Sequence, residues 1–228
     1  MFRHSRAMAA LLSLAFFAAC GDTIEITGSN AGSATVRFIN ATDANIDVSN
    51  AGSVATGNNN LGFGTNTSCM SVNTSGATGT GLVFNQAGTT TAVPGFTQSF
   101  LTGGTYTVLA YPSSTGTQFI TVNNAGFTPT SGQAGLRVFN AASTIGSIVV
   151  LGGGTALGTG TGVSYGNAGS FINVPAGSQT ITFNTGAGTT TIANAGSLSF
   201  TAGQTYTLVV APAAAGSNTL RTFLVSGC

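Results

Sequence analysis

The chain has 228 residues, of which only 4% are charged, and it contains neither lysine nor tryptophan. Globular domains carry about 25% charged residues, so solubility here must come from threonine, serine, asparagine and backbone amides. Beyond the N-terminal segment the only basic residues are Arg37, Arg137 and Arg221. Three scattered arginines cannot form the basic face that neutralises phosphates, which excludes nucleic acid as a partner.

The N-terminus has the zones of an export signal. Arg3, His4 and Arg6 precede an uncharged apolar run of 13 residues at 7–19. A run of that length is typical of a secretory signal and falls short of the ~20 residues that span a bilayer as a helix. We therefore expect residues 1–19 to be a signal peptide.

Cys20 is the predicted lipidation site. Segment 17–21, Phe-Ala-Ala-Cys-Gly, resembles a bacterial lipobox, in which the cysteine is acylated and becomes the first residue of the mature chain. Acyl chains would hold the protein on a membrane without a transmembrane segment. Plain secretion and an uncleaved anchor are the alternatives. Gly21 after the cysteine favours the outer membrane or cell surface over the periplasm, and residues 20–32 would form the lipidated cysteine and a flexible stalk.

The odd number of cysteines agrees with this interpretation. If Cys20 carries lipid, Cys69 and Cys228 remain as an even pair in an oxidising compartment. The sequence predicts an intramolecular disulfide between them. Two unpaired thiols, or a bridge between molecules, are the alternatives.

Several motifs recur 100 residues apart. Segment 34–41, Ala-Thr-Val-Arg-Phe-Ile-Asn-Ala, returns with changes at 134–141, and 103–108 returns at 203–208. This period is longer than the ~20–50 residues of solenoid repeats and matches a small β domain duplicated in tandem. We expect one domain at 33–128 and a second at 134–228, with a short linker between them.

Strand signals fill both repeats. Residues 35–39 alternate Val36 and Phe38 against Arg37, the pattern of a half-buried strand. Glycine, asparagine and serine clusters separate the other β-branched or aromatic runs. These runs are 82–85, 106–111, 120–123, 171–174, 180–183, 206–210 and 219–225. The predicted fold class is all-β, with two tandem immunoglobulin-like or transthyretin-like β-sandwich domains after a signal peptide.

At this point the motifs resemble a known family. Val-Arg-Phe-Ile-Asn-Ala at 36–41, Asp47-Val48, Leu-Gly-Phe-Gly at 61–64 and Gly-Gly-Thr-Tyr-Thr-Val at 103–108 are similar to the secreted bacterial family called domain of unknown function 4397. The resemblance extends over both repeats. It implies an envelope location and a sandwich fold, and it implies no activity.

Residue types that carry catalysis are scarce. The only histidine, His4, lies in the predicted signal, and lysine is absent. A Ser-His-Asp triad, a Cys-His pair and a histidine zinc site are therefore excluded in the mature chain. Outside the predicted stalk, Asp43 and Asp47 are the only carboxylates available for acid–base work. We expect no enzyme and no cofactor.

Asp43, Asn45 and Asp47 alternate like the start of a calcium loop. Valine occupies the sixth and twelfth positions, however, where an EF-hand needs glycine and glutamate. A turn is the favoured interpretation, because aspartate and asparagine stabilise turns locally. The second repeat has Ser143 and Ser147 at the 100-residue offset, which argues against an essential metal.

Arg37 and Arg137 recur at matching places, each followed three residues later by an asparagine, Asn40 or Asn140. The favoured interpretation is a solvent-facing charge followed by a turn residue. The alternative is a shared recognition position or an inter-sheet hydrogen-bonding position.

Two functions are open. The first is a non-catalytic envelope lipoprotein, structural or adhesive, that meets the membrane through its lipid and has a surface protein or polysaccharide as partner. The alternative is a glycan-binding surface protein. Sugar sites usually stack on exposed aromatic rings, and Tyr106 and Tyr206 are expected in core or corner packing. That leaves Tyr111, Tyr165 and a few phenylalanines as platforms.

Overall fold

The computed structural model describes residues 32–50, 53–54, 58–74, 81–158, 162–186, 190–214 and 216–228. These residues form sixteen strands and no helix, which confirms the predicted all-β class. None of them therefore belongs to a helix long and apolar enough to cross a membrane. The predicted signal peptide, Cys20 and the predicted stalk up to residue 31 lie outside the described residues.

The strands make two sandwiches. The first contains β1 Ser33–Asn40, β2 Ile46–Asn50, β3 Ser53–Val54, β4 Met70–Asn73, β5 Leu82–Gln86, β6 Thr105–Ser113 and β7 Gly116–Asn123. The second contains β8 Gln133–Asn140, β9 Ser147–Gly152, β10 Thr155–Ala156, β11 Val163–Ser164, β12 Ile172–Pro175, β13 Gly177–Thr185, β14 Thr191–Phe200, β15 Thr205–Pro212 and β16 Leu220–Ser226.

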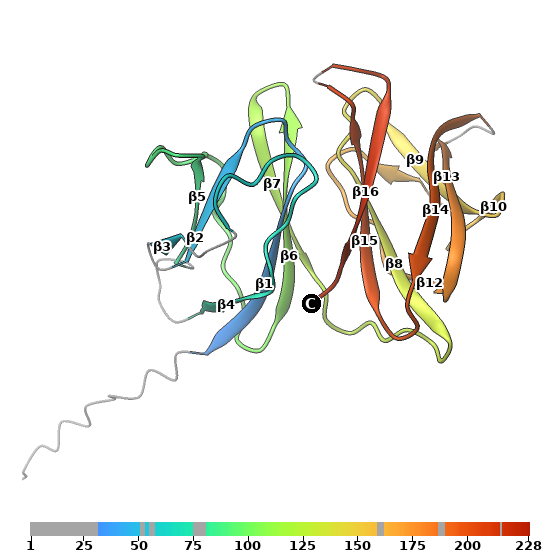
Figure 1. The fold of residues 1–228 in the computed structure, drawn as a ribbon, viewed down its shortest axis with the longest axis horizontal. Helices are drawn as coiled ribbons and strands as arrows, with labels where there is room; N and C mark the ends of the chain where they lie inside the picture. The colour runs from blue at the N-terminus through green and yellow to red at the C-terminus, as the bar shows by residue number, and fades with distance from the viewer. Residues whose placement is uncertain are drawn as a thin grey trace, which may run out of the picture.

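Each sandwich consists of two sheets. In the first, a sheet ordered β4-β1-β6-β7 packs on a sheet ordered β3-β2-β5. In the second, β12-β8-β15-β16 packs on β10-β9-β13-β14, with β11 paired to β9. The sheets that contain β1 and β8 are the inner ones, so the molecule has four layers and the chain ends between the two sandwiches (Figure 1).

Strand pairing is the same in both sandwiches. β1 lies parallel to β6, and β8 lies parallel to β15, with Thr35 opposite Thr105 and Gly135 opposite Thr205. These pairs keep the 100-residue offset seen in the sequence. β2 and β9 are offset by two residues more, because Val48 faces Phe84 while Val150 faces Phe183.

This offset changes one sequence assignment. Asp47 lies opposite Asn85 in the first sandwich, and the residue in the corresponding place of the second is Val149, opposite Asn184. The assignment of Ser147 to that place was wrong, because two more residues separate Asn140 from Ile148 than separate Asn40 from its counterpart Ile46.

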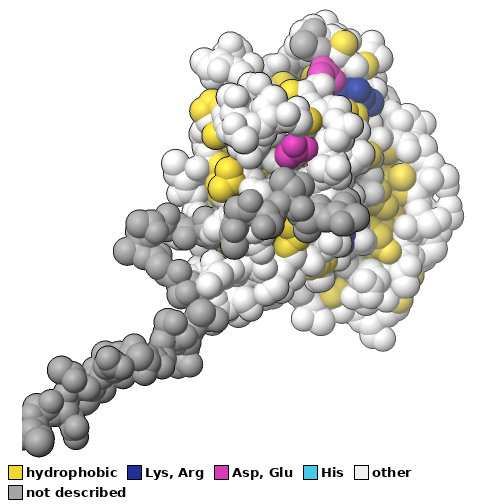
Figure 2. Space-filling model, turned by 60° about the vertical axis from the view of Figure 1, so that its left-hand side comes forward, with side chains coloured by type: hydrophobic (Ala, Val, Ile, Leu, Met, Phe, Trp, Pro, Cys, Tyr) yellow, Lys and Arg dark blue, Asp and Glu magenta, His cyan; other side chains and the backbone are white. Residues whose placement is uncertain are grey.

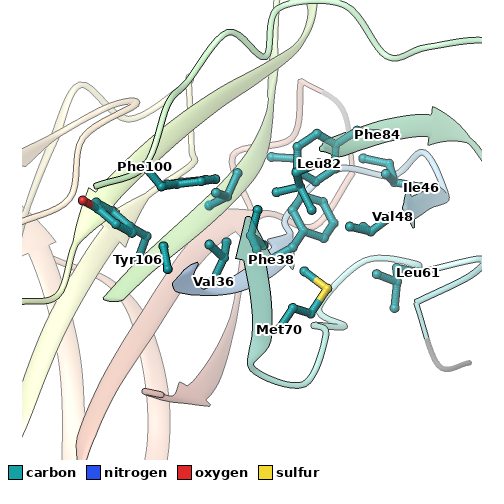
Figure 3. Packing of buried hydrophobic residues seen from close by; sticks show 14 residues of the cluster. Val36, Phe38, Ile46, Val48, Leu61, Met70, Leu82, Phe84, Phe100 and Tyr106 are labelled. Atoms are coloured by element: carbon teal, nitrogen blue, oxygen red, sulfur yellow. The ribbon is translucent and has the colours of Figure 1, made fainter. Parts of the chain in front are cut away.

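The inner strands are buried on both faces. On β1, Phe38 packs in the core of the first sandwich while Ile39 belongs to a separate cluster. Figure 3 shows Phe38 beside Phe84, and their ring centroids are 4.8 Å apart. The prediction of a half-buried strand at 35–39 is wrong at Ile39, because the second sandwich covers the face that the pattern assigns to solvent.

A third hydrophobic core joins the two sandwiches. Its fully buried members come from the inner strands and the residues that follow them: Ile39, Ala41 and Leu109 from the first sandwich, and Phe139, Ala141, Val209, Ala211 and Val225 from the second. Neighbouring residues on the same strands fill the two sandwich cores, since successive side chains of a strand point to opposite faces. The two sandwiches therefore form one body.

Each strand run expected from the sequence coincides with a strand, although runs 171–174 and 219–225 begin one residue before β12 and β16. The strands that were not anticipated are β3, β4, β9, β10, β11 and β14. The turn predicted at Asp43, Asn45 and Asp47 is wrong from Ile46 onward, where β2 begins. Aspartate and asparagine favour a turn in this segment, whereas the alternating Ile46 and Val48 favour a strand. The strand forms because Ile46 and Val48 are both fully buried in the first core.

Candidate functional site

Charged side chains are few, and the fold uses every one that lies in the described residues. Figure 2 shows few charged side chains on the face it displays. Among the residues with described positions, no group of three or more His, Cys, Asp or Glu side chains gathers where it could hold a metal. The contacts of the five charged residues therefore define what chemistry is available.

Arg137 is buried, with 2% of its surface exposed. It donates hydrogen bonds to Asn124 Oδ1 at 2.7 Å and Thr207 Oγ1 at 3.3 Å, and its guanidinium lies 4.4 Å from the ring centroid of Phe171. Burial lowers the pKa of the Arg137 guanidinium to about 10. The solvent-facing interpretation is wrong for this residue, because Asn124 and Phe171 cover it.

Arg37 makes the reciprocal contact and is only partly covered. It donates to the backbone oxygen and hydroxyl of Ser226 and to Cys69 Sγ. Burial lowers the pKa of Arg37. Each arginine thus contacts the end of the other sandwich: Arg37 reaches Ser226 at the end of β16, and Arg137 reaches Asn124 just after β7. This geometry favours the inter-sheet hydrogen-bonding interpretation.

Asn40 is fully buried at the end of β1 and organises the loops around it. Its amide nitrogen donates to the carbonyl oxygens of Ala44 at 2.7 Å and Leu61 at 2.8 Å. Its amide oxygen accepts from the backbone nitrogen of Thr42 at 2.9 Å. The residue is therefore a buried loop anchor rather than an exposed turn residue.

Asn140 occupies the same place at the end of β8 and is also fully buried. It donates to the carbonyl oxygen of Val163 at 3.0 Å and accepts from the backbone nitrogen of Ala142 at 3.0 Å. The asparagine that recurs after each arginine thus has a structural explanation in both sandwiches.

Replacing Asn40 by alanine is expected to lower the free energy of unfolding by about 3 kcal/mol, because buried backbone groups lose their partners. Chemical denaturation followed by circular dichroism measures this loss. Asn45→Ala is the matched control, since Asn45 is exposed and its removal should change stability by less than about 0.5 kcal/mol. Equal losses for the two variants would contradict the anchoring role of Asn40.

The three calcium candidates do not converge on one point. The carboxylate of Asp43 pairs with Arg221. The amide of Asn45 donates to Asn60 Oδ1 at 2.8 Å. Asp47 is 9% exposed, and its two oxygens accept from backbone nitrogens in two separate loops. Asp43 is thus paired with Arg221, whereas Asn45 and Asp47 both contact Asn60, the first at its side chain and the second at its backbone nitrogen.

Asp47 fixes two loops of the first sandwich to β2. Its Oδ1 accepts from the backbone nitrogen of Asn60 at 2.6 Å, and its Oδ2 accepts from that of Gly88 at 2.8 Å. Asn60 has a φ of 52°, a left-handed conformation that non-glycine residues seldom adopt. A hydrogen bond to a carboxylate at this residue stabilises that conformation.

Arg221, on β16, completes the charged set. It pairs with Asp43 across the two sandwiches, and its guanidinium lies 3.1 Å from the ring centroid of Phe63. Phe63 in turn packs edge-on against Phe223, with centroids 5.2 Å apart. A cation over an aromatic ring is attracted by the ring quadrupole, so this group also holds the two sandwiches together.

Tyr106 and Tyr206 have the same corner role in the two sandwiches. The Tyr106 hydroxyl accepts from the backbone nitrogen of Leu101 at 3.1 Å, and the Tyr206 hydroxyl accepts from that of Thr201 at 3.0 Å. Each ring also packs on a phenylalanine of the preceding strand or loop. At Gly104 a Cβ would lie 2.5 Å from the Tyr106 ring, so a side chain there would displace it.

Tyr111 and Tyr165 are not free platforms for sugar stacking. They pack edge-on, with centroids 5.7 Å apart, and Tyr111 also packs edge-on against Phe139. The Tyr165 hydroxyl donates to the carbonyl oxygen of Pro112 at 2.5 Å, which joins the two sandwiches. Burial raises the pKa of Tyr111; burial, and then the charge of Tyr111, raise the pKa of Tyr165.

These shifts predict a loss of stability at alkaline pH. A phenol whose pKa is raised by folding keeps its proton longer in the folded state, so its contribution is complete below pH ~10 and falls as the pH rises through the folded pKa. We expect part of the phenolate absorbance to appear only at a higher pH than for free tyrosine, and to appear at lower pH when urea unfolds the protein. Tyr111→Phe should remove part of this high-pH absorbance and allow Tyr165 to ionise at lower pH. Identical titration curves for wild type and variant would contradict the assignment.

Cys69 and Cys228 form the disulfide predicted from the sequence, with Cα atoms 5.7 Å apart. Cys69 lies just before β4 and Cys228 follows β16, so the bond links the first sandwich to the C-terminal end of the second. Both residues are exposed, and Arg37 contacts Cys69.

The described surface has several hollows, one of them about 470 Å³ and lined by Thr144, Ser147 and Thr185. A groove of about 570 Å³ lies near the β6–β7 turn of the first sandwich. Its described lining is uncharged and carries amides and hydroxyls from Asn45, Asn60, Gln86 and Thr117. Another hollow of about 460 Å³ enters the core of the second sandwich and reaches Leu136 and Val138.

Comparison with known proteins gives a family. No curated protein matches the sequence. Among solved structures, a family 26 carbohydrate-binding module of Amy13K from Eubacterium rectale, in complex with maltoheptaose, has a TM-score of 0.30 and 12% identity, with 86% of this chain and 97% of that chain covered. At that score the likeness carries no inference about a ligand of this chain. The sequence model of the domain of unknown function DUF4397 matches residues 34–151. This match spans the first sandwich and continues to β9 of the second, and the chain belongs to the DUF4397 family.

Proposed function

We propose that the protein is a non-catalytic, lipid-anchored envelope protein that presents its two sandwiches as one rigid structural or adhesive body. One observation carries the proposal: all five charged side chains of the described residues, Arg37, Asp43, Asp47, Arg137 and Arg221, are bound to partners inside the fold. General acid–base catalysis needs a group that is free to exchange a proton with substrate. These groups are instead committed to holding loops and sheets.

The junction between the sandwiches supports the rigid part of the proposal. Small interfaces between domains permit relative motion, whereas a large apolar one opposes it. Here a core of fully buried side chains, including Leu109 and Phe139, is supplemented by the Asp43–Arg221 pair and the disulfide. A stiff body suits a protein that holds a partner at a set distance from a membrane.

The anchoring part rests on the N-terminal pattern that ends at Cys20. A disulfide between the two remaining cysteines fits an oxidising compartment. The proposed location is the outer membrane or cell surface, with the acyl chains as the only contact with the bilayer. An adhesive role would bring a surface protein or polysaccharide as partner.

The intact mass of the membrane-extracted protein tests the anchor. The expected result is a chain that begins at Cys20 with acyl additions, and a gain of two hydrogens when reductant opens the Cys69–Cys228 bond. An unmodified chain that begins elsewhere would overturn anchoring. Unaltered surface attachment and envelope integrity in a deletion strain would overturn the structural or adhesive role.

Glycan binding is the second candidate, and the uncharged groove of the first sandwich favours it. Amide and hydroxyl groups at Asn45, Asn60, Gln86 and Thr117 suit the neutral hydroxyls of a saccharide. A glycan array with envelope and host polysaccharides tests this candidate. Binding that Gln86→Ala abolishes and that Gln204→Ala retains would support the groove, because Gln204 is exposed on the second sandwich and does not line it. An array without binding would eliminate this candidate.

A further inference from the structure

The second sandwich contains a cavity that opens between its two sheets. It has a volume of about 460 Å³ and reaches Leu136, Val138 and Val150, all of which are less than 9% exposed. Leu157, Val163 and Ile172 form its sides. Ligand pockets typically measure about 300–1,000 Å³ and have apolar walls, so both size and lining are those of a binding site.

The first sandwich fills the same place with its own side chains. Leu136 lies opposite Ile172 as Val36 lies opposite Met70, and Val163 pairs with Ile148 as Leu61 pairs with Ile46. The strand registers therefore match residues of the two sandwiches directly. The positions of Phe38, Leu61 and Thr67 in the first sandwich are taken by Val138, Val163 and Gly169 in the second.

All three changes replace a larger side chain by a smaller one, and the three smaller residues all line the cavity. In the first sandwich Phe38 packs on Phe84, with Leu61 and Met70 close by (Figure 3). In the second, the smaller Val138 lines the cavity, while Phe183, the counterpart of Phe84, stays fully buried in the core. Protein interiors are normally packed without voids of this size, so an apolar group from outside the chain suits the vacated space.

The rim of the cavity is polar and uncharged. Ser164, Asn167 and Ser170 are exposed and line it, and no charged residue belongs to its described lining. A ligand with a long aliphatic part and a neutral polar end would satisfy both regions. A carboxylate or phosphate would find no cation among these residues.

We propose that this cavity of the second sandwich binds one fatty acyl chain. The aliphatic walls select an alkyl chain over a polar ligand. The hydroxyl and amide groups at the rim can form hydrogen bonds with its neutral end, donating to an ester and donating to or accepting from an alcohol. The choice of an acyl chain among apolar molecules rests on the proposed function, which places the protein at a lipid surface.

The binding test uses the mature chain from residue 20 with Cys20→Ser, which lacks both the apolar segment 7–19 and the acyl acceptor and therefore needs no detergent that would compete for the cavity. Methyl esters from octanoate to hexadecanoate are titrated and followed by native mass spectrometry. We expect saturable binding of one ester per chain, with an optimum length. A second arm mixes the protein with phosphatidylethanolamine vesicles. Lipid molecules that the protein takes up from the vesicles identify membrane lipid as the source of the acyl chain, whereas binding of the methyl esters without lipid uptake identifies free acyl compounds. No binding in either arm overturns the proposal.

Val138→Phe restores the residue of the first sandwich and should abolish binding while the protein remains folded. Val83→Phe is the matched control, because Val83 is 40% exposed on the first sandwich and the same substitution there leaves the cavity open. If Val138→Phe does not fold, methyl resonances of Val138, Val150 and Leu157 in the Cys20→Ser chain supply the second measurement. Ester-dependent shifts confined to these and the other lining methyl groups, such as those of Val163 and Ile172, support the site, and shifts elsewhere or none overturn it.

This outcome is independent of anchoring. Binding by the Cys20→Ser chain together with an unacylated wild-type protein would leave the cavity site intact and refute the proposed anchor. If the wild-type protein is acylated but the Cys20→Ser variant binds no ester, the anchor stands and the cavity site is refuted.

Discussion

Replacing Phe139 by alanine is expected to lower the free energy of unfolding by about 4 kcal/mol, the range for a large aromatic removed from a packed core. Phe139 is fully buried in the core between the sandwiches and packs edge-on against Tyr111. Because it belongs to neither sandwich core, its loss should act on the junction. Denaturation in urea measures the loss, and hydrogen exchange at Leu109 and Val209 should show increased opening.

Two controls separate this junction effect from general destabilisation. Leu101→Ala, at a residue 74% exposed, should change stability by less than about 0.5 kcal/mol. Phe38→Ala, in the core of the first sandwich, should be comparably destabilising but raise exchange chiefly within that sandwich. If Phe139→Ala left exchange at Leu109 and Val209 unchanged, the third core would not couple the two sandwiches.

Removing the disulfide is the second large effect. A bond between residues 159 apart restricts the unfolded chain, and loop-closure entropy assigns it at most about 5 kcal/mol. The double variant Cys69→Ser/Cys228→Ser should therefore unfold at much lower denaturant concentration than the oxidised protein. It also releases the C-terminal end of β16, where Arg37 binds Ser226.

Reductant provides the matched control for this experiment. Dithiothreitol should shift the denaturation midpoint of the wild-type protein to that of the double variant, and it should leave the variant unchanged. Equal midpoints for oxidised and reduced wild type would mean that the bond adds nothing to the contacts of the third core.

Both predictions concern contacts that join the two halves of the chain, and these contacts are reciprocal. Arg37 reaches the end of β16, while Arg137 reaches the segment after β7. Residues at equivalent positions thus meet each other's sandwich, as in a symmetric dimer whose interface uses the same patch of both subunits. Two sandwiches that pack in this way keep their inner sheets away from water.

Local sequence patterns determined the all-β class, most of the longer strands and the pairing of Cys69 with Cys228. A β-strand is set by the alternation and branching of a few neighbouring residues, which a single segment displays. Likewise, an even pair of cysteines in an exported chain has few partners to choose from. Tyr106 and Tyr206 could be assigned to core or corner packing for the same reason, since each lies within a strong strand pattern.

The tertiary structure alone decided what faces each strand. The pattern of Val36, Arg37 and Phe38 states that one face of β1 is apolar, but not that the second sandwich covers the other. That covering turned Arg137 from an expected surface charge into a buried hydrogen-bonding group and made the Asp43–Arg221 pair a contact between sandwiches. Asp47 was likewise interpreted as a turn residue. Its actual partners are backbone amides of two loops distant in sequence, which the local pattern does not display.

Cys20 remains the residue on which the proposed location depends, and its assignment comes from the sequence alone. The apolar run at 7–19 and Cys20 are contiguous in the sequence, so the pattern can be recognised without the folded structure. The cavity behind Val138 is the opposite case. Its walls come from strands that long-range pairing brings together, and only matching the registers of the two sandwiches shows that Phe38 has been replaced there by a smaller side chain.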